Sequence, residues 1–166
     1  MNDDLISLYA FNRWAERKML DACRKLSPEQ YAAEPVPGWS SIRSSIVHIA
    51  NATEGWIRAL NREEVPSRAT EDDLPTVDDV ERRLEPVYAI LDAVLPGLTP
   101  EQLTTPRTFS SRRGSIVLPP WTVLRHVVNH ATYHRGQVAS KLKRLGVEQP
   151  ATDFIFWAFE QAANKA

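Results

Sequence analysis

Residues 126–138 read HVVNHATYHRGQV, and the spacing within this stretch decides the expected fold. Apolar residues recur in it at intervals of three and four, which predicts one long amphipathic helix. The same period continues outward to Leu145. Pro119 and Pro120 suit the first turn of this helix, and Gly146 suits the position just past its end. Three of the chain's four histidines follow the interval of four: His126, His130 and His134.

Three further segments upstream carry the same helical period. These helices are expected at residues 3–26, from Ser40 or Ser41 to about Asn61, and from Thr76 to about Leu95. Capping residues mark the starts of the second and third helices. Pro86 is expected to bend the third helix. Four long helices with little strand content predict an all-α four-helix bundle, and no repeat or second domain interrupts residues 1–166.

A small β-hairpin is expected between the third and fourth helices. Two β-prone runs, Thr105–Ser110 and Ser115–Leu118, flank a turn at Arg113-Gly114. The aromatic tail ATDFIFWAFEQAA is expected to pack back on the bundle.

Composition excludes several classes of protein. Lys and Arg total 20 against 21 for Asp and Glu, so the chain lacks the basic excess that binds nucleic acid or anionic membranes. Its single cysteine, Cys23, cannot form an internal disulfide, and the N-terminus has no signal-peptide pattern. No run of about 18 apolar residues could span a bilayer. These features favour a cytoplasmic protein.

The histidines of the fourth helix can form two chelating pairs, because side chains four apart lie about 5 to 6 Å from each other. His130 belongs to both pairs. On a helical wheel His134 lies roughly 50° from the apolar centre, His130 about 90° and His126 about 130°. This favours His130 and His134 at the rim of the buried face. His126 is interpreted as a neighbour.

A third ligand would have to come from His48, the remaining histidine, which lies on the second long helix. If the second and fourth helices run antiparallel, His48 meets His130 and His134; if they run parallel, it meets His126 and His130. Three rim histidines would leave an ion one open position, which is the arrangement of reactive metal sites. A functional and a structural interpretation both stay open for Glu54 and Arg135.

Three sequence blocks resemble the DinB-like (DinB/YfiT) family of metal-dependent proteins. They are Tyr9-Ala-Phe-Asn-Arg-Trp14, Ile46-Val-His-Ile-Ala-Asn-Ala-Thr-Glu54 and His126-Val-Val-Asn-His-Ala-Thr-Tyr-His-Arg-Gly-Gln137. The resemblance spans nearly the whole chain. One departure is Tyr133, where relatives often carry a histidine that is not expected to be a ligand.

This resemblance implies an up-down-down-up four-helix bundle, frequent homodimers, and a divalent metal held by His48, His130 and His134. Zinc or nickel is the expected ion, with iron or manganese as alternatives. The leading hypothesis is a metalloenzyme that acts on a small molecule, as a transferase that uses a low-molecular-weight thiol. The positive charge of the ion would equally support metal-assisted hydrolysis. The alternative is a stress-responsive binding or structural protein whose metal staples two helices without catalysis.

Overall fold

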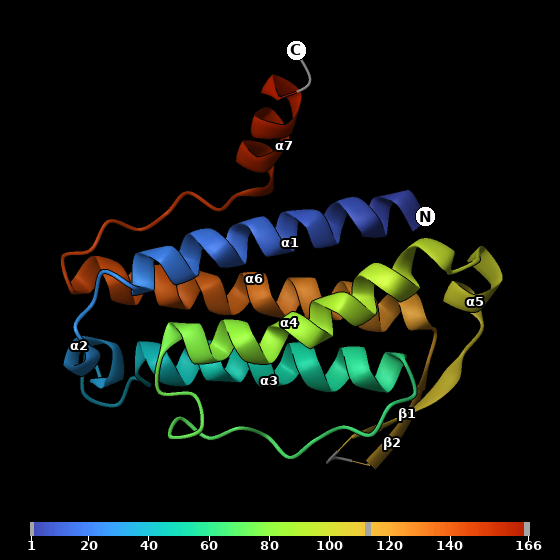
Figure 1. The fold of residues 1–166 in the computed structure, drawn as a ribbon, viewed down its shortest axis with the longest axis horizontal. Helices are drawn as coiled ribbons and strands as arrows, with labels where there is room; N and C mark the ends of the chain where they lie inside the picture. Colours follow the sequence, from blue (N-terminus) through green and yellow to red (C-terminus); the bar gives the residue numbers. More distant parts are fainter. Residues whose placement is uncertain (1, 112–113, 165–166) are drawn as a thin grey trace.

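Four long helices form the body of the protein in the computed structural model, which describes residues 2–111 and 114–164 (Figure 1). The long helices are α1 (Asn2–Cys23), α3 (Ile42–Leu60), α4 (Val77–Val94) and α6 (Pro120–Arg144). The shorter elements are α2 (Pro28–Ala32), the 3-10 turn η1 (Leu95–Gly97), α5 (Pro100–Thr104), strands β1 (Arg107–Ser111) and β2 (Gly114–Leu118), and α7 (Phe154–Ala163). This confirms the predicted helical bundle with a hairpin before its last long helix.

The long helices follow the predicted up-down-down-up order. In Figure 1, α3 and α4 run in one direction, whereas α1 and α6 run in the other. The chain returns from the end of α3 to the start of α4 through a long irregular segment that lies beside α3. As a result α3 and α6 are antiparallel neighbours, which is the arrangement that brings His48 to the level of His130 and His134.

Capping residues fix the starts of the helices that matter for the site. The Ser41 hydroxyl accepts a hydrogen bond from the backbone N–H of Ser44 at 2.8 Å, so Ser41 caps α3. Thr76 and Asp79 form the predicted capping box at the start of α4. Helix α6 begins with Pro120 as its first residue, and Gly146 past its end has a φ of 74°, which glycine adopts without strain.

The hairpin pairs β1 with β2 in antiparallel register, with Phe109 opposite Ile116. Phe109 is fully buried, and its ring lies edge-on to that of Trp56 at 6.3 Å, so the hairpin is anchored to α3. The β1 strand begins two residues later than predicted. Arg113, half of the predicted turn, lies outside the described residues.

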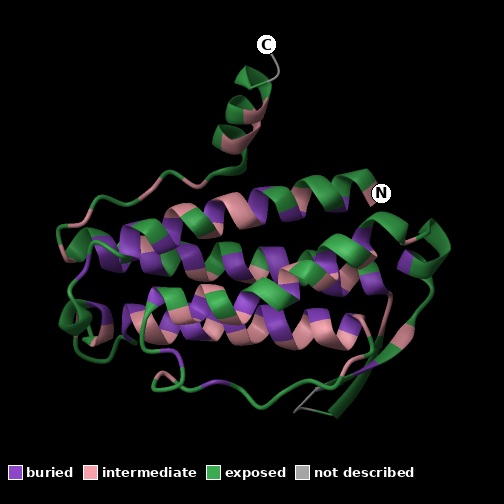
Figure 2. Cartoon of the chain, viewed as in Figure 1, coloured by how far each residue is buried: buried purple, intermediate pink, exposed green. Residues whose placement is uncertain are grey.

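The core lies along the facing sides of the four helices, where buried residues gather (Figure 2). The apolar stripe predicted for α6 is buried, including Val123, Leu124, Val127 and Val138. Burial of each such side chain stabilises the fold by about 1.5–3 kcal/mol. Among the described residues, no helix combines the length and apolar character that a membrane crossing requires.

Helix α7 packs on α1 along one side only. The Phe154 and Trp157 rings contact that of Phe11 at 5.1 and 6.2 Å. Glu160 accepts hydrogen bonds from the Trp14 indole at 2.6 Å and from Lys18 at 2.8 Å. The expected packing of the tail is confirmed on this side, but much apolar surface of α7 is exposed, on Phe154, Ile155, Phe156 and Phe159.

Cys23 at the end of α1 is a buried core residue, and burial raises the pKa of its thiol to about 12. Because thiolate is the reactive form, we expect Cys23 to resist a thiol reagent such as dithionitrobenzoate at pH 8 in the native protein. Full reaction is expected after addition of guanidinium chloride, measured by absorbance. Rapid stoichiometric labelling of native protein, with its circular dichroism unchanged, would contradict this assignment.

Candidate metal centre

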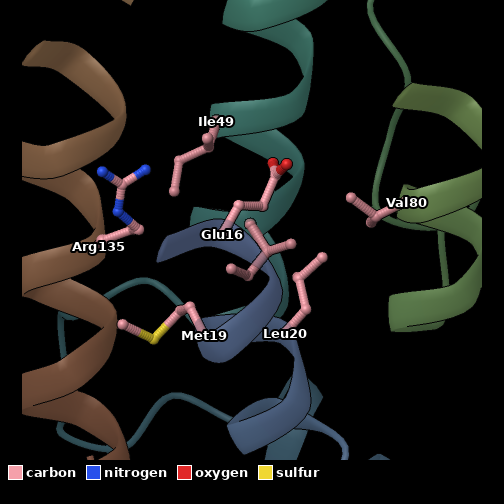
Figure 3. A pocket seen from close by; sticks show the side chains of 7 residues that line it. Glu16, Met19, Leu20, Ile49, Val80 and Arg135 are labelled. Carbon is pink, nitrogen blue, oxygen red and sulfur yellow. The ribbon is translucent and has the colours of Figure 1, made fainter. Parts of the chain in front are cut away.

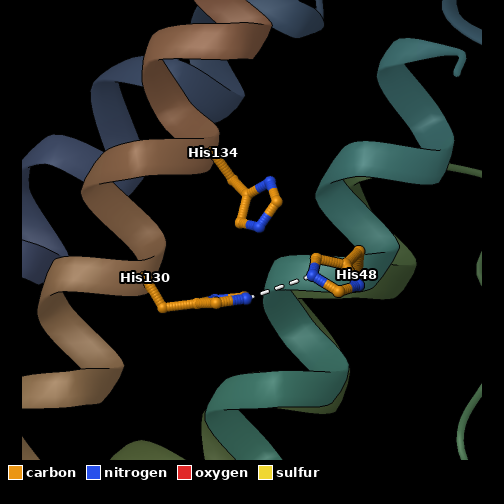
Figure 4. A group of neighbouring side chains, drawn as sticks. All are labelled: His48, His130 and His134. Carbon is orange, nitrogen blue, oxygen red and sulfur yellow. Dashed lines mark hydrogen bonds between the residues drawn. The ribbon is translucent and has the colours of Figure 1, made fainter. Parts of the chain in front are cut away.

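Three histidines from two antiparallel helices converge on one side of the bundle (Figure 4). His48 comes from α3, and His130 and His134 lie one turn apart on α6. One ring nitrogen of each lies within 4.8 Å of the corresponding nitrogens of the other two. All three residues are half-buried, so the cluster sits at the rim of the bundle, as the helical wheel predicted.

The spacing of these nitrogens fits a shared ion. His48 Nε2 and His130 Nε2 are 3.1 Å apart. Two nitrogens bound to one tetrahedral zinc ion at 2.0–2.1 Å would lie about 3.3 Å apart, so this pair already has the required separation. Two facing lone pairs repel each other unless a hydrogen or a cation lies between them. A ring nitrogen of His134 lies within 4.8 Å of the ligand atoms of both, so a third donor is close to the same point.

A neighbouring side chain orients the third ring. His134 Nδ1 lies 2.8 Å from Gln137 Oε1, and a hydrogen on Nδ1 donated to this oxygen leaves the Nε2 lone pair free. Ligating histidines commonly have such a partner, which fixes the ring and its tautomer. Sequence reasoning missed this role of Gln137. The signal was its position three residues after His134, on the same helix face.

Electrostatics keep two rings of the cluster, those of His48 and His130, in the form that binds metals. Burial, followed by the positive charges of neighbouring groups, lowers the pKa of His48, and the same causes lower the pKa of His130 to about 4. These imidazoles are therefore neutral near pH 7, with lone pairs available to an ion. The charged side chains that lower these pKa values are other histidines and Arg68.

His126 extends the row of rings without joining the cluster. It is exposed, its ring lies 5.5 Å from that of His130, and it stands edge-on to Trp56 at 5.6 Å. The three-histidine group described above does not include it. Together, His126 and Trp56 form an aromatic border beside the cluster.

Arg135 follows His134 in sequence but faces the other way, into the bundle. Its guanidinium donates to Asn12 Oδ1 at 2.7 Å and to Thr132 Oγ1 at 2.8 Å. With Glu16 it lines a cavity of about 10 Å³ between the helices (Figure 3). Burial lowers the pKa of Arg135 to about 10, still well above neutrality. Arg135 is therefore a charged core residue and does not contact the histidines.

Glu54 is also directed away from the cluster. Its carboxylate accepts hydrogen bonds from Arg58 Nε at 3.0 Å and Arg83 Nε at 2.7 Å. This buried carboxylate thus links α3 to α4. A proton-shuttle role at the cluster has no support from this geometry.

The fold and the cluster together define the class of protein: a four-helix bundle with a candidate metal site formed by three histidines from two helices. The chain belongs to the DinB family, whose model matches residues 1–165. This confirms the family that the sequence blocks indicated.

Relatives and solved structures agree with this assignment. Protein DinB of Bacillus subtilis (strain 168) is 26% identical to this chain over 177 residues, which cover 100% of both proteins. A DinB-like protein from Bacillus cereus has a similar crystal structure, with a TM-score of 0.70 and 20% identity over 90% of this chain and 95% of that one. The crystal structure of another DinB-like protein, from Bacillus subtilis, has a TM-score of 0.63. Its sequence is 16% identical, and the match covers 88% of this chain and 97% of that one. At these identities the structures show the fold alone.

Proposed function

We propose that this protein is a metal-dependent enzyme that acts on a small-molecule substrate at a site formed by His48, His130 and His134. The observation that carries the proposal is the convergence of one ring nitrogen from each residue within 4.8 Å at a half-buried rim. We propose zinc or nickel as the ion, with iron or manganese as alternatives. Imidazole suits zinc, nickel and iron, whereas manganese more often takes oxygen ligands.

The reaction proposed is a transfer that uses a low-molecular-weight thiol. A divalent ion held by three neutral imidazoles keeps its full charge and, when bound, lowers the pKa of a thiol or water molecule at its open position. The protein's own residues would hold and orient the ion's ligands. His130 and His48 hold neutral nitrogens at the rim, Gln137 fixes the His134 ring, and the packed helices behind them exclude water from one side.

Two further features belong to the proposal. We infer action in the cytoplasm, because the single cysteine leaves no internal disulfide, as is usual in a reducing compartment. We also infer a homodimer, for which the exposed apolar residues of α7 offer a surface suited to self-association. Balanced charge opposes a role in binding DNA.

The proposal predicts metal and thiol binding that can be measured separately. Protein purified without a nickel column is expected to contain close to stoichiometric divalent metal. Adding zinc to the chelator-treated protein should stabilise it by about 2.7 kcal/mol when the free metal is 100 times its Kd, which a thermal shift detects. A screen of physiological thiols should then raise the melting temperature of metal-loaded protein only.

A second candidate function is a structural protein whose ion staples α3 to α6. The observation that favours it is that His48 and His130 lie on different helices, 82 residues apart in sequence. X-ray absorption of the loaded protein separates the two candidates. An exchangeable water or thiol in the coordination sphere supports the enzyme, whereas a fourth protein ligand closing the sphere supports the staple.

A further inference from the structure

The irregular segment between α3 and α4 is held against α3 by hydrogen bonds beside the histidine cluster. Asn51 Nδ2 donates to the Ala69 carbonyl at 2.9 Å, and the Ala69 N–H donates to Asn51 Oδ1 at 2.8 Å. Arg83 donates to the carbonyl of Ser67 at 3.2 Å. Ala69 is buried. The residues on both sides of Arg68 are thus fixed by hydrogen bonds, although no regular secondary structure holds them.

This attachment places Arg68 next to the candidate metal centre. Asn51 lies three residues after His48, which is about 4.5 Å along the axis of α3. The paired hydrogen bonds therefore hold the backbone next to Arg68 against α3, about one helical turn from His48.

Arg68 has no counter-ion. It is exposed, and within the described part of the chain its side chain makes neither a hydrogen bond nor an ion pair. The buried carboxylate of Glu54, the acidic residue of α3, is already paired with Arg58 and Arg83. Neutral imidazoles add no negative charge. A divalent ion at the cluster would therefore stand beside a second, unpaired cation, and this combination attracts an anion.

We propose that Arg68 is a specificity-determining residue that binds the carboxylate of an anionic substrate held at the histidine cluster. This inference rests on the proposed function, because it names the class of substrate for the same site. The planar guanidinium can bind a carboxylate through two parallel hydrogen bonds. Asn51 is a positioning residue, since it acts by holding the backbone of Ala69. The border of Trp56 and His126 offers the remainder of the substrate an aromatic surface.

The test compares two thiols of equal length on cobalt-loaded protein: mercaptopropionate, which carries a carboxylate, and mercaptopropanol, which is neutral. Binding is followed by the visible absorption of cobalt. We expect the wild-type protein to bind mercaptopropionate about fivefold more tightly, the upper range for an exposed charged pair. The Arg68→Gln variant should bind both thiols equally while retaining its metal. Arg17→Gln, which removes an exposed arginine from α1, should keep the wild-type preference.

Propionate, which has no thiol, distinguishes failure of the two proposals. If neither thiol gives a sulfur-to-metal absorption band but propionate binds Arg68→Gln about fivefold more weakly than wild type, the thiol proposal fails and the role of Arg68 stands. An unchanged preference in Arg68→Gln overturns the role of Arg68, as does loss of metal from that variant. Inorganic phosphate that binds more tightly than propionate would overturn the choice of a carboxylate.

Discussion

Replacing His130 by alanine is expected to remove nearly all metal binding. His130 Nε2 faces His48 Nε2 at 3.1 Å, and the His130 ring lies 4.4 Å from that of His134, so its loss leaves only two of the three ring nitrogens. Loss of an outer partner of a metal ligand typically lowers affinity about 10- to 100-fold, and loss of a ligand should exceed that. Competition with a chromophoric chelator measures the affinity directly, and elemental analysis gives the metal content.

His126→Ala is the matched control, because it removes the same side chain from the same helix one turn earlier. His126 is exposed and lies outside the three-histidine group, so this variant should keep wild-type affinity. Circular dichroism should show both variants to be as helical as the wild type. Full metal occupancy in a variant that lacks both His130 and His134 would refute the proposed site.

The second large effect is expected from Arg135→Ala, which should lower the free energy of unfolding by about 3–5 kcal/mol. The substitution removes a buried cation, leaves Asn12 Oδ1 without its donor, and deprives the Glu16 carboxylate of a nearby positive charge. Burial already raises the pKa of Glu16, so the loss of this cation adds to an existing cost. Urea unfolding followed by circular dichroism measures the change.

Arg125→Ala provides the control, since Arg125 lies on the same helix but pairs with Asp4 at the surface. An exposed pair of this kind contributes at most about 1 kcal/mol. Arg135→Ala should also keep its affinity for metal, because Arg135 faces the core. If that variant lost the metal while its unfolding free energy stayed unchanged, Arg135 would belong to the site.

The helices were predictable because their apolar period reflects burial against neighbouring helices, as the fully buried Val138 and Leu142 of α6 illustrate. The choice between Ser40 and Ser41 as the cap of α3 was not predictable, because both hydroxyls can serve. The structure assigns the cap to Ser41, whereas Ser40 accepts a hydrogen bond from Lys141 at 2.9 Å. That contact joins residues far apart in sequence, and no local pattern indicates it.

The same distinction between local and distant contacts applies to the candidate site. Spacing on one helix left two chelating pairs open, and the antiparallel topology that the family resemblance implied grouped His48 with His130 and His134. The inward direction of Arg135 depends on Asn12 in α1, and the position of Arg68 depends on Asn51 in α3. Side chains that meet through tertiary packing or an irregular segment follow no periodic sequence pattern. Their roles could therefore be recognised only in the structure.

The histidine contact between α3 and α6 would make the stability of the protein depend on the supply of metal. An ion bound to both His48 and His130 would close a covalent loop of 82 residues that contains α4 and the hairpin. A cross-link of that span restricts the unfolded chain by an entropy worth about 4.5 kcal/mol at 25 °C in the chain-entropy model for disulfides. Unlike a disulfide, this cross-link would form and dissociate without a change of oxidation state. The persistence of the folded protein in the cell would then follow the concentration of free metal.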